Sequence, residues 1–335
     1  MNKSTGLLTD SQGREHNYLR ISLTEKCNLR CTYCMPAEGV PLTPSSELMT
    51  ADELFEIAKL FASEGVDKIR LTGGEPLVRK DFNKILQKLS TLPVSLALTT
   101  NAVLVDRFIS QFKEAGLSKI NVSLDTFNPK RFKKITLKSH FTKVKENIEL
   151  LVQEGFEVKV NVVLLKGVND DEIIDFIQWT ANQTYHIRFI EFMPFDGNNW
   201  DRSKTVGLKE IQDRVHSNFG ADQVISLLAD PNETSKNFKI KGFKGNYGII
   251  STVTNPFCDS CNRLRLTANG RLRNCLFSEK ESDLLTALRA GNPIKPIISK
   301  VVARKKPIRA GLDVPDRFED PAHHSRNRSM IRIGG

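Results

Sequence analysis

Three cysteines near the start of the sequence constrain this chain more than any other feature. Cys27, Cys31 and Cys34 form the pattern C-x3-C-x2-C, and three thiolates at this spacing can share one metal site. A structural zinc ion prefers four protein ligands, and no fourth cysteine or histidine lies close by. A cubane of four irons held by three thiolates keeps one iron open to an outside ligand. The spacing alone leaves both sites possible.

The sequence holds six cysteines in all, and the other three, Cys258, Cys261 and Cys275, lie near its other end. Residues 1–17 lack the apolar core of a secretory signal, and no apolar run approaches the roughly 18 residues of a membrane helix. We therefore expect a cytoplasmic protein. A reducing cytoplasm argues against disulfides and in favour of metal binding or catalysis.

The positive charge of the chain is concentrated at one end. The net charge is +10, and residues 258–335 supply +8 of it, from 16 Lys or Arg against 8 Asp or Glu. Such a stretch predicts a polyanionic partner, either nucleic acid or a nucleoside triphosphate, unless it is only a solvated surface. We find no basic patch interleaved with aromatic residues of the kind that stacks bases, which disfavours nucleic acid.

An amphipathic helix that ends at a glycine and is followed at once by a strand recurs along the first two thirds of the chain. The helix predicted at 50–64 begins with the capping pair Thr50 and Glu53 and ends at Gly65. Gly116 and Gly155 end similar helices. The predicted strands are Leu19–Thr24, Lys68–Thr72, Val94–Thr99, Lys119–Leu124, Glu157–Leu165 and His186–Met193.

Six strands alternating with helices indicate a parallel sheet in an α/β fold. Six units fit a partial (β/α)6 barrel of the TIM type better than a complete eightfold barrel, and a doubly wound sheet is the alternative. After Met193 we predict a polar linker at 195–204, a helix at about 206–219, a short β element at 237–253 and an irregular basic end. We therefore predict one domain at residues 1–200 and a smaller one at 201–335.

Polar residues recur where the apolar strands end, which is the face of a β/α barrel that carries the chemistry. Burying them without partners would cost on the order of 1–3 kcal/mol each, so a ligand pocket explains the set, although each alone could be a cap or a bond to backbone. The set contains the stretch Thr72-Gly73-Gly74-Glu75-Pro76, Thr99, Thr100, Asn101, Ser123, Asp125, Lys159, Asn161, Arg188, Glu191 and Met193.

The C-x3-C-x2-C motif, with Tyr33 before its last cysteine and Gly-Gly-Glu-Pro at the next strand end, resembles the radical S-adenosylmethionine superfamily over residues 19 to about 195. The resemblance implies a partial barrel with a [4Fe–4S] cluster on Cys27, Cys31 and Cys34. Its open iron would chelate S-adenosylmethionine, which is cleaved to a 5′-deoxyadenosyl radical. Matching positions for contacts to S-adenosylmethionine are Tyr33, Gly74, Ser123 and Met193.

The second cysteine group has the pattern C-x2-C-x13-C and again offers three thiolates. Strand alternation puts Arg263 and Arg265 on one side of the segment between them, where two guanidiniums suit a phosphate chain. A zinc clip completed by His323 or His324 is the alternative to a second cluster with an open iron.

The whole set of motifs, with the stretch 188–193 (RFIEFM) and the closing Gly334-Gly335, resembles the family of GTP 3′,8-cyclases of molybdenum cofactor biosynthesis. The resemblance implies that the radical takes the hydrogen from C3′ of GTP, after which C3′ attacks guanine C8 to give 3′,8-cyclo-7,8-dihydro-GTP. It implies a downstream cyclic pyranopterin monophosphate synthase and a homodimer, and leaves the electron donor unspecified. No nucleic-acid or membrane partner is expected.

Further site residues follow from that resemblance, position by position. The Gly-Gly tail is expected to reach into the active site. A second [4Fe–4S] cluster, whose open iron meets the guanine base, would be held by Cys258, Cys261 and Cys275. Contacts to GTP are expected from Arg20, Arg70, Thr99, Lys159, Arg263 and Arg265.

The chain departs from the family at Ala102, where Thr-Thr-Asn is normally followed by glycine, and alanine disfavours positive φ. Two other functions stay open. A radical enzyme acting on another substrate, such as a peptide, would share the first cluster, although such enzymes usually carry more than three extra cysteines. A zinc scaffold that binds nucleic acid through its basic end would need neither cluster.

Overall fold

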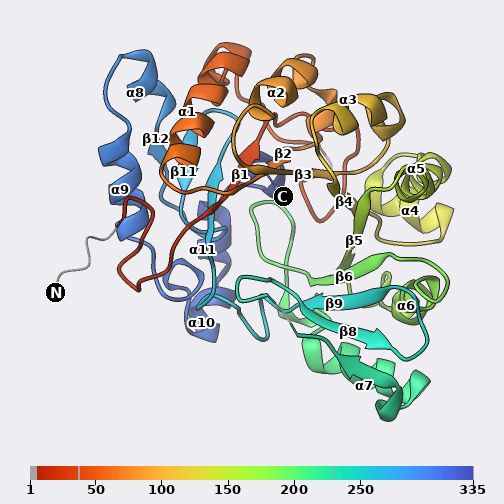
Figure 1. Cartoon of the computed structure of the whole chain (residues 1–335). Helices are drawn as coiled ribbons and strands as arrows, with labels where there is room; N and C mark the ends of the chain where they lie inside the picture. Colours follow the sequence, from red (N-terminus) through yellow and green to blue (C-terminus); the bar gives the residue numbers. More distant parts are fainter. Residues whose placement is uncertain (1–5, 37, 229, 335) are drawn as a thin grey trace.

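The computed structural model describes residues 6–36, 38–228 and 230–334, and Figure 1 shows a curved sheet with helices α1 to α6 along its outer side. No helix among these residues is both long and apolar enough to span a membrane. The six predicted strands are all present, with ends that differ from prediction by at most two residues: β1 (Tyr18–Ser22), β2 (Lys68–Thr72), β3 (Ser95–Thr100), β4 (Lys119–Ser123), β5 (Glu157–Leu164) and β6 (His186–Glu191).

The helices that follow these strands cover the outer face of the sheet. The predicted capping box at Thr50 and Glu53 begins the first of them. The helix expected near 105–112 is instead a 3-10 turn at Val105–Arg107 followed by a short α-helix. Their bounds are α1 (Ala51–Ser63), α2 (Phe82–Leu89), α3 (Ile109–Glu114), α4 (Pro129–Thr136), α5 (Phe141–Gln153) and α6 (Ile173–Trp179).

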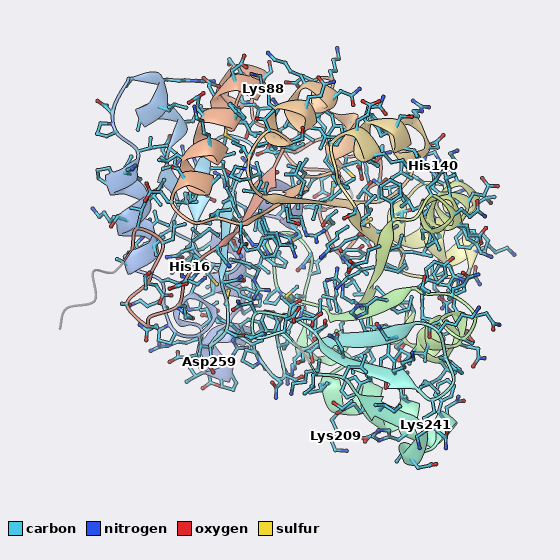
Figure 2. All side chains as sticks on the ribbon, viewed as in Figure 1. His16, Lys88, His140, Lys209, Lys241 and Asp259 are labelled. Atoms are coloured by element: carbon cyan, nitrogen blue, oxygen red, sulfur yellow. The ribbon has the colours of Figure 1, made fainter. Side chains whose placement is uncertain are left out.

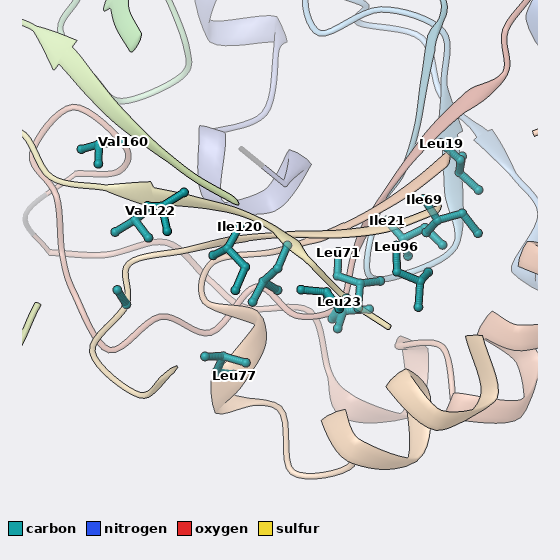
Figure 3. Packing of buried hydrophobic residues seen from close by; sticks show 14 of the residues in the cluster. Leu19, Ile21, Leu23, Ile69, Leu71, Leu77, Leu96, Ile120, Val122 and Val160 are labelled. Carbon is teal, nitrogen blue, oxygen red and sulfur yellow. The ribbon is translucent and has the colours of Figure 1, made fainter. Parts of the chain in front are cut away.

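The core lies between the sheet and these helices. Side chains that alternate along the strands, such as Leu19, Ile69 and Ile120, are fully buried and pack together on one face (Figure 3). The opposite face of the same strands carries the polar residues of the site. This division between the two faces is what a β/α barrel requires, because one face packs helices and the other faces the interior.

Strands from the second half of the chain extend the sheet at both edges. In the linear order β12-β11-β10-β1-β2-β3-β4-β5-β6-β9-β8-β7, strand β10 lies parallel to β1 and β9 lies parallel to β6. The parallel run therefore contains eight strands and is open, with antiparallel strands beyond it. The added strands are β7 (Val224–Ser226), β8 (Lys236–Ile240), β9 (Asn246–Ile250), β10 (Arg263–Leu266), β11 (Arg271–Arg273) and β12 (Ser282–Asp283).

Two expectations for the second half were wrong. The last 60 residues are not irregular, because short helices run through them. The stretch 195–204 is not a free polar linker, because Phe195 and Asn198 are buried in it. The predicted helix near 206–219 is present, and the remaining helices are α7 (Leu208–Phe219), α8 (Leu285–Arg289), α9 (Lys295–Ala303), α10 (Pro315–Glu319), α11 (Pro321–Arg326) and α12 (Met330–Ile333). The domain boundary near residue 200 stays a prediction.

Candidate active site

The first cavity lies at the carboxyl ends of β1 to β6. All three cysteines of the first motif reach it from the loop after β1. Backbone bonds from Arg30 to Thr136 and from Thr32 to Ile135 hold that loop against α4. The expected contacts to S-adenosylmethionine all fall here, and the lining includes Cys27, Cys31, Tyr33, Cys34, Gly73, Gly74, Thr99, Ser123, Asp125, Asn161 and Met193.

The two glycines after β2 allow close approach to the start of the cysteine loop. A Cβ on Gly73 would lie 2.7 Å from the carbonyl oxygen of Thr24, and one on Gly74 would lie 2.5 Å from that of Lys26. Gly74 N–H and Glu75 N–H donate to these same two carbonyls at 2.8 and 2.9 Å. The motif therefore fixes the loop through backbone contacts that no side chain could allow.

Gly74→Ala is expected to destabilise the protein by about 1–3 kcal/mol, because the new methyl group meets backbone that cannot move aside freely. We expect the iron bound per chain to fall as well. Gly6→Ala is the matched control, since its nearest neighbour would lie 3.7 Å away. Denaturant unfolding of both variants measures the loss. Equal stability of the two variants would contradict this account of the motif.

Two strand-end carboxylates accept hydrogen bonds that hold the fold together, and of these Glu191 also lines the first cavity. Glu75 is fully buried and accepts hydrogen bonds from Thr100 Oγ1 at 2.8 Å and Asn101 N–H at 2.7 Å. Burial raises the pKa of Glu75 to about 7. Glu191 accepts from Val253 N–H at 2.7 Å, so it ties β6 to the second half of the chain. The alternative that such residues make structural bonds is thus correct for these two carboxylates.

Asp125 and Tyr33 form the polar side of the first cavity. Tyr33 Oη donates to Asp125 Oδ2 at 2.8 Å, and the N–H of Val163 donates to Oδ1 at 2.9 Å. Burial raises the pKa of Asp125 to about 6, although these two donors oppose the rise. A carboxylate that ionises near neutral pH beside the cysteines suits a cationic ligand.

The three thiols of the first motif all line the first cavity. Burial raises the pKa of Cys27 to about 11 and that of Cys34 to about 12, so a metal that binds there must displace the thiol protons. Within the described residues, no three His, Cys, Asp or Glu side chains are grouped to hold a single metal ion. Thiolates that bind different corners of a cubane need not converge on one point. The donor set, three thiols around one cavity, fits such a cluster.

The stretch 195–204 closes the first cavity on the side of the cysteine loop. The Asn198 amide donates to the carbonyl oxygens of Met193 at 2.8 Å and Tyr33 at 3.3 Å. Gly197 is packed so closely that a Cβ there would lie 2.5 Å from Pro36. Sequence reasoning missed this wall because its composition is that of a solvent-exposed linker.

The second cavity adjoins the first, and Asn161, Ile190, Met193 and Met330 line both. It is strongly cationic, although Glu157, Asp230 and Glu233 also line it. The second cysteine triad opens onto it together with most of the residues expected to contact GTP: Arg20, Arg70, Lys159, Cys258, Cys261, Arg263, Arg265 and Cys275. Thr99 is the exception, because it lines the first cavity, where its buried Oγ1 has no hydrogen-bond partner in the part of the chain that the structure describes.

The arginines of the second cavity lack enough anions. Burial lowers the pKa of Arg20 to about 10 and that of Arg188 to about 9. Arg20 Nε is buried without a hydrogen-bond partner among the described residues, and Arg188 is bound only to the neutral Asn161, at 2.7 Å. Buried cations without matching carboxylates are costly, so this cavity is suited to a polyanionic ligand.

Tyr18 is a member of this site that sequence reasoning missed. Its hydroxyl accepts a hydrogen bond from Arg70 Nε at 2.6 Å, and Lys68 Nζ lies 4.9 Å from its ring centroid. Burial raises its pKa, but Arg70, Arg20 and Lys68 outweigh burial and lower the value to about 7. Strand alternation could have predicted its position, because Tyr18 lies two residues before Arg20 and therefore on the same strand face. It was missed because the predicted strand began at Leu19.

The second triad sits beside Arg263 and Arg265, which line one cavity as their alternation predicts. Burial raises the pKa of Cys261, whereas Arg263 and Lys305 lower it, and the result is about 6. The two histidines considered as zinc ligands lie elsewhere. His324 Nε2 is bound to the carbonyl oxygen of Phe318 at 2.7 Å, and His323 lines a neighbouring groove but not the second cavity itself.

The last described residues enter the interior, as Figure 1 shows from the position of the C label inside the curve of the sheet. Gly334 accepts a hydrogen bond from Arg265 at 2.7 Å, and a Cβ on it would lie 2.5 Å from Thr72 Oγ1. Gly335 lies outside the described residues. Ala102 adopts the positive φ of 61° that glycine would favour, and its carbonyl accepts from Asn147 at 2.6 Å, so the family turn is kept.

Two family models match consecutive parts of the chain. The Radical SAM superfamily matches residues 21–180, and Molybdenum Cofactor Synthesis C matches residues 185–310. The Streptococcus suis protein SuiB, solved bound to S-adenosylmethionine, is 15% identical with a TM-score of 0.56, covering 81% of this chain and 65% of that one. At this identity the likeness concerns the fold alone.

Curated relatives match nearly the whole chain. The mitochondrial GTP 3′,8-cyclase of Arabidopsis thaliana is 45% identical over 100% of this chain and 85% of its own length. The GTP 3′,8-cyclase of Lactiplantibacillus plantarum is 39% identical over 98% and 99%. Human molybdenum cofactor biosynthesis protein 1 is 46% identical over 98% of this chain but 51% of its own length, so the chain spans about half of that relative.

Proposed function

The chain belongs to the radical S-adenosylmethionine superfamily and, within it, to the family of GTP 3′,8-cyclases, and from this we propose that it converts GTP to 3′,8-cyclo-7,8-dihydro-GTP in molybdenum cofactor biosynthesis. The observation that carries the proposal is the pair of adjoining cavities. One presents three thiols and the carboxylates of Asp125 and Glu191, and the other presents three thiols and more arginines than carboxylates.

We assign the first cavity to S-adenosylmethionine and to a [4Fe–4S] cluster on Cys27, Cys31 and Cys34. When bound, such a cluster supplies the electron that cleaves the sulfonium of S-adenosylmethionine. The protein contributes position and charge. Gly74 lets the ligand approach backbone, Met193 excludes water, and Asp125 with Tyr33 faces the cation.

We assign the second cavity to GTP. Arg20, Arg70 and Lys159 would pair with the triphosphate, and their spacing across three parallel strands suits a chain of phosphates rather than one anion. Arg263 and Arg265 border the second triad, where the guanine base would meet a second [4Fe–4S] cluster on Cys258, Cys261 and Cys275. The residues shared by both cavities would then hold the ribose next to the radical source.

The proposal assigns radical generation to residues 1–200 and the second cluster to residues 201–335. A homodimer, a downstream cyclic pyranopterin monophosphate synthase and a cytoplasmic location stay predictions, and the plant relative is named as mitochondrial. Arg265 lines the second cavity and donates a hydrogen bond to the carbonyl oxygen of Gly334. This contact supports a role for the C-terminal tail at that cavity.

One experiment separates this function from the alternatives. The protein is purified anaerobically, reconstituted, and mixed with reductant, S-adenosylmethionine and GTP deuterated at C3′. We expect about eight irons per chain, four for each triad, and deuterium in the 5′-deoxyadenosine. Colourless protein with zinc and no sulfide would support the scaffold instead. Active protein that leaves the deuterium on GTP would indicate another substrate, such as a peptide.

Binding of S-adenosylmethionine is expected to weaken about tenfold between pH 7.5 and pH 5. Asp125 has a raised pKa of about 6, so it is ionised at the higher pH and largely protonated at the lower, where it no longer attracts the cationic ligand. Calorimetry on the reconstituted protein measures both constants. The Asp125→Asn variant should bind weakly at both values. An unchanged pH dependence in that variant would exclude Asp125 as its source.

A further inference from the structure

Lys305, a buried lysine that the proposed reaction does not use, lies against the second cysteine triad. The residue follows α9 and is 4% exposed. Its Nζ lies 3.4 Å from Cys261 Sγ and donates to the carbonyl oxygen of Arg263 at 3.0 Å. A buried ammonium is costly unless its three protons find acceptors, and here a sulfur and backbone carbonyls provide them.

A fully buried histidine completes the surroundings of Lys305. His16 Nδ1 lies 3.5 Å from Lys305 Nζ, and His16 Nε2 lies 3.0 Å from Asp10 Oδ2. The carboxylate beside Nε2 favours the tautomer that carries its proton there, which leaves Nδ1 free to accept from the lysine. Burial and the neighbouring lysine lower the pKa of His16 to about 4, so the ring is neutral.

The segment that carries Asp10 and His16 is also bonded to the second triad. Arg14 binds Asp10 Oδ2 at 2.7 Å and donates to the carbonyl oxygens of Cys258 at 2.8 Å and Lys306 at 3.0 Å. Figure 2 shows His16 and, below it, Asp259 of the triad loop on the same side of the molecule. The contacts form one continuous chain from Asp10 through His16 and Lys305 to Cys261.

We propose that Lys305, held in place by His16 and Asp10, sets the reduction potential of the cluster bound by the second triad. The inference rests on the proposed second cluster. A cation that donates to a ligand sulfur stabilises a cluster more after it has gained an electron than before, so it raises the potential. Lys305 acts through Cys261 and touches no substrate, which makes it a positioning residue rather than a catalytic one.

The potential can be measured on a full-length chain in which Cys27, Cys31 and Cys34 are replaced by serine, so that only the second triad binds iron. A redox titration followed by electron paramagnetic resonance gives its midpoint. Lys305→Met is expected to lower the midpoint by about 59 mV, a tenfold change in the one-electron equilibrium. Lys306→Met is the matched control, because it removes the same charge from an exposed neighbour, and it should leave the midpoint unchanged.

The outcomes separate the two proposals. If the parent chain binds no iron, the second cluster fails, and this inference fails with it. If the cluster is present and Lys305→Met titrates at the parent midpoint, only the role of Lys305 is overturned. If Lys305→Met cannot hold iron, His16→Gln decides, because it loosens the lysine without removing it. A decrease in the midpoint smaller than about 59 mV in His16→Gln supports the inference, and an unchanged midpoint overturns it.

Discussion

Replacing Arg20 by alanine is expected to weaken GTP binding by about 100-fold and to leave the binding of S-adenosylmethionine within about twofold. A hydrogen bond to a charged group contributes about 1.5–3 kcal/mol, and the upper end of this range corresponds to roughly two powers of ten in a dissociation constant. Arg20 should lie at that end, because its Nε is buried and has no partner among the described residues until an anion binds. Calorimetry with each ligand measures the two effects.

Binding of guanosine provides the control for this prediction. Guanosine lacks phosphates, so Arg20→Ala should bind it as the unmodified protein does. Arg131→Ala removes a half-buried arginine that lies outside both cavities and is paired with Asp171 at 2.8 Å, so it should change the binding of neither ligand. If Arg20→Ala loses affinity for GTP and for guanosine equally, Arg20 contacts the nucleoside and not the triphosphate.

Cys275→Ser is expected to halve the iron content, from about eight to about four per chain, and to reduce cyclised product by about 100-fold or more. The first triad is intact in this variant, so S-adenosylmethionine should still bind. The product is lost because GTP loses its contact at the second triad, and a misplacement of about 1 Å at a reacting centre can cost a factor of about 100. Iron analysis, ligand binding and product chromatography measure the three quantities.

Ser260→Ala is the control, since it changes a residue between two other cysteines of the triad, Cys258 and Cys261, without removing a thiol. It should retain about eight irons and full product. If Cys275→Ser keeps its iron, Cys275 is no ligand. If it loses half of the iron and still cyclises GTP at the original rate, the second triad has another role.

Much of the fold and site was predictable because it follows local patterns. Alternating helices and strands gave the parallel sheet, and polar residues at strand ends gave the face that carries the site. The residues expected around S-adenosylmethionine line one cavity, and the positions expected around GTP line the next, with Thr99 as the exception. The resemblance to the family supplied these positions, whereas periodicity supplied only the strands and the polar residues at their ends.

The features that sequence reasoning missed depend on contacts between distant segments. Lys305 and His16 are 289 residues apart, and no local pattern joins them. The alternation in β10 was visible, but its pairing with β1 was not, and α10 has five residues, which is too short for a period to be recognised. The composition of 195–204 resembles a linker, yet its asparagine amide bonds place it against the cysteine loop.

The placement of β10 beside β1 has a consequence for how the chain reaches its native state. Tyr18 pairs with Arg263, which lies 245 residues further along the chain, so one edge of the parallel run is completed only after residue 263 has been synthesised. Parallel pairing over such a separation forms slowly, because the chain loses the entropy of closing a long loop before the strand contacts stabilise it. Until then β1 and β6 are open edges, which invite intermolecular pairing. Folding inside the cell is therefore most exposed to aggregation during synthesis of the second half.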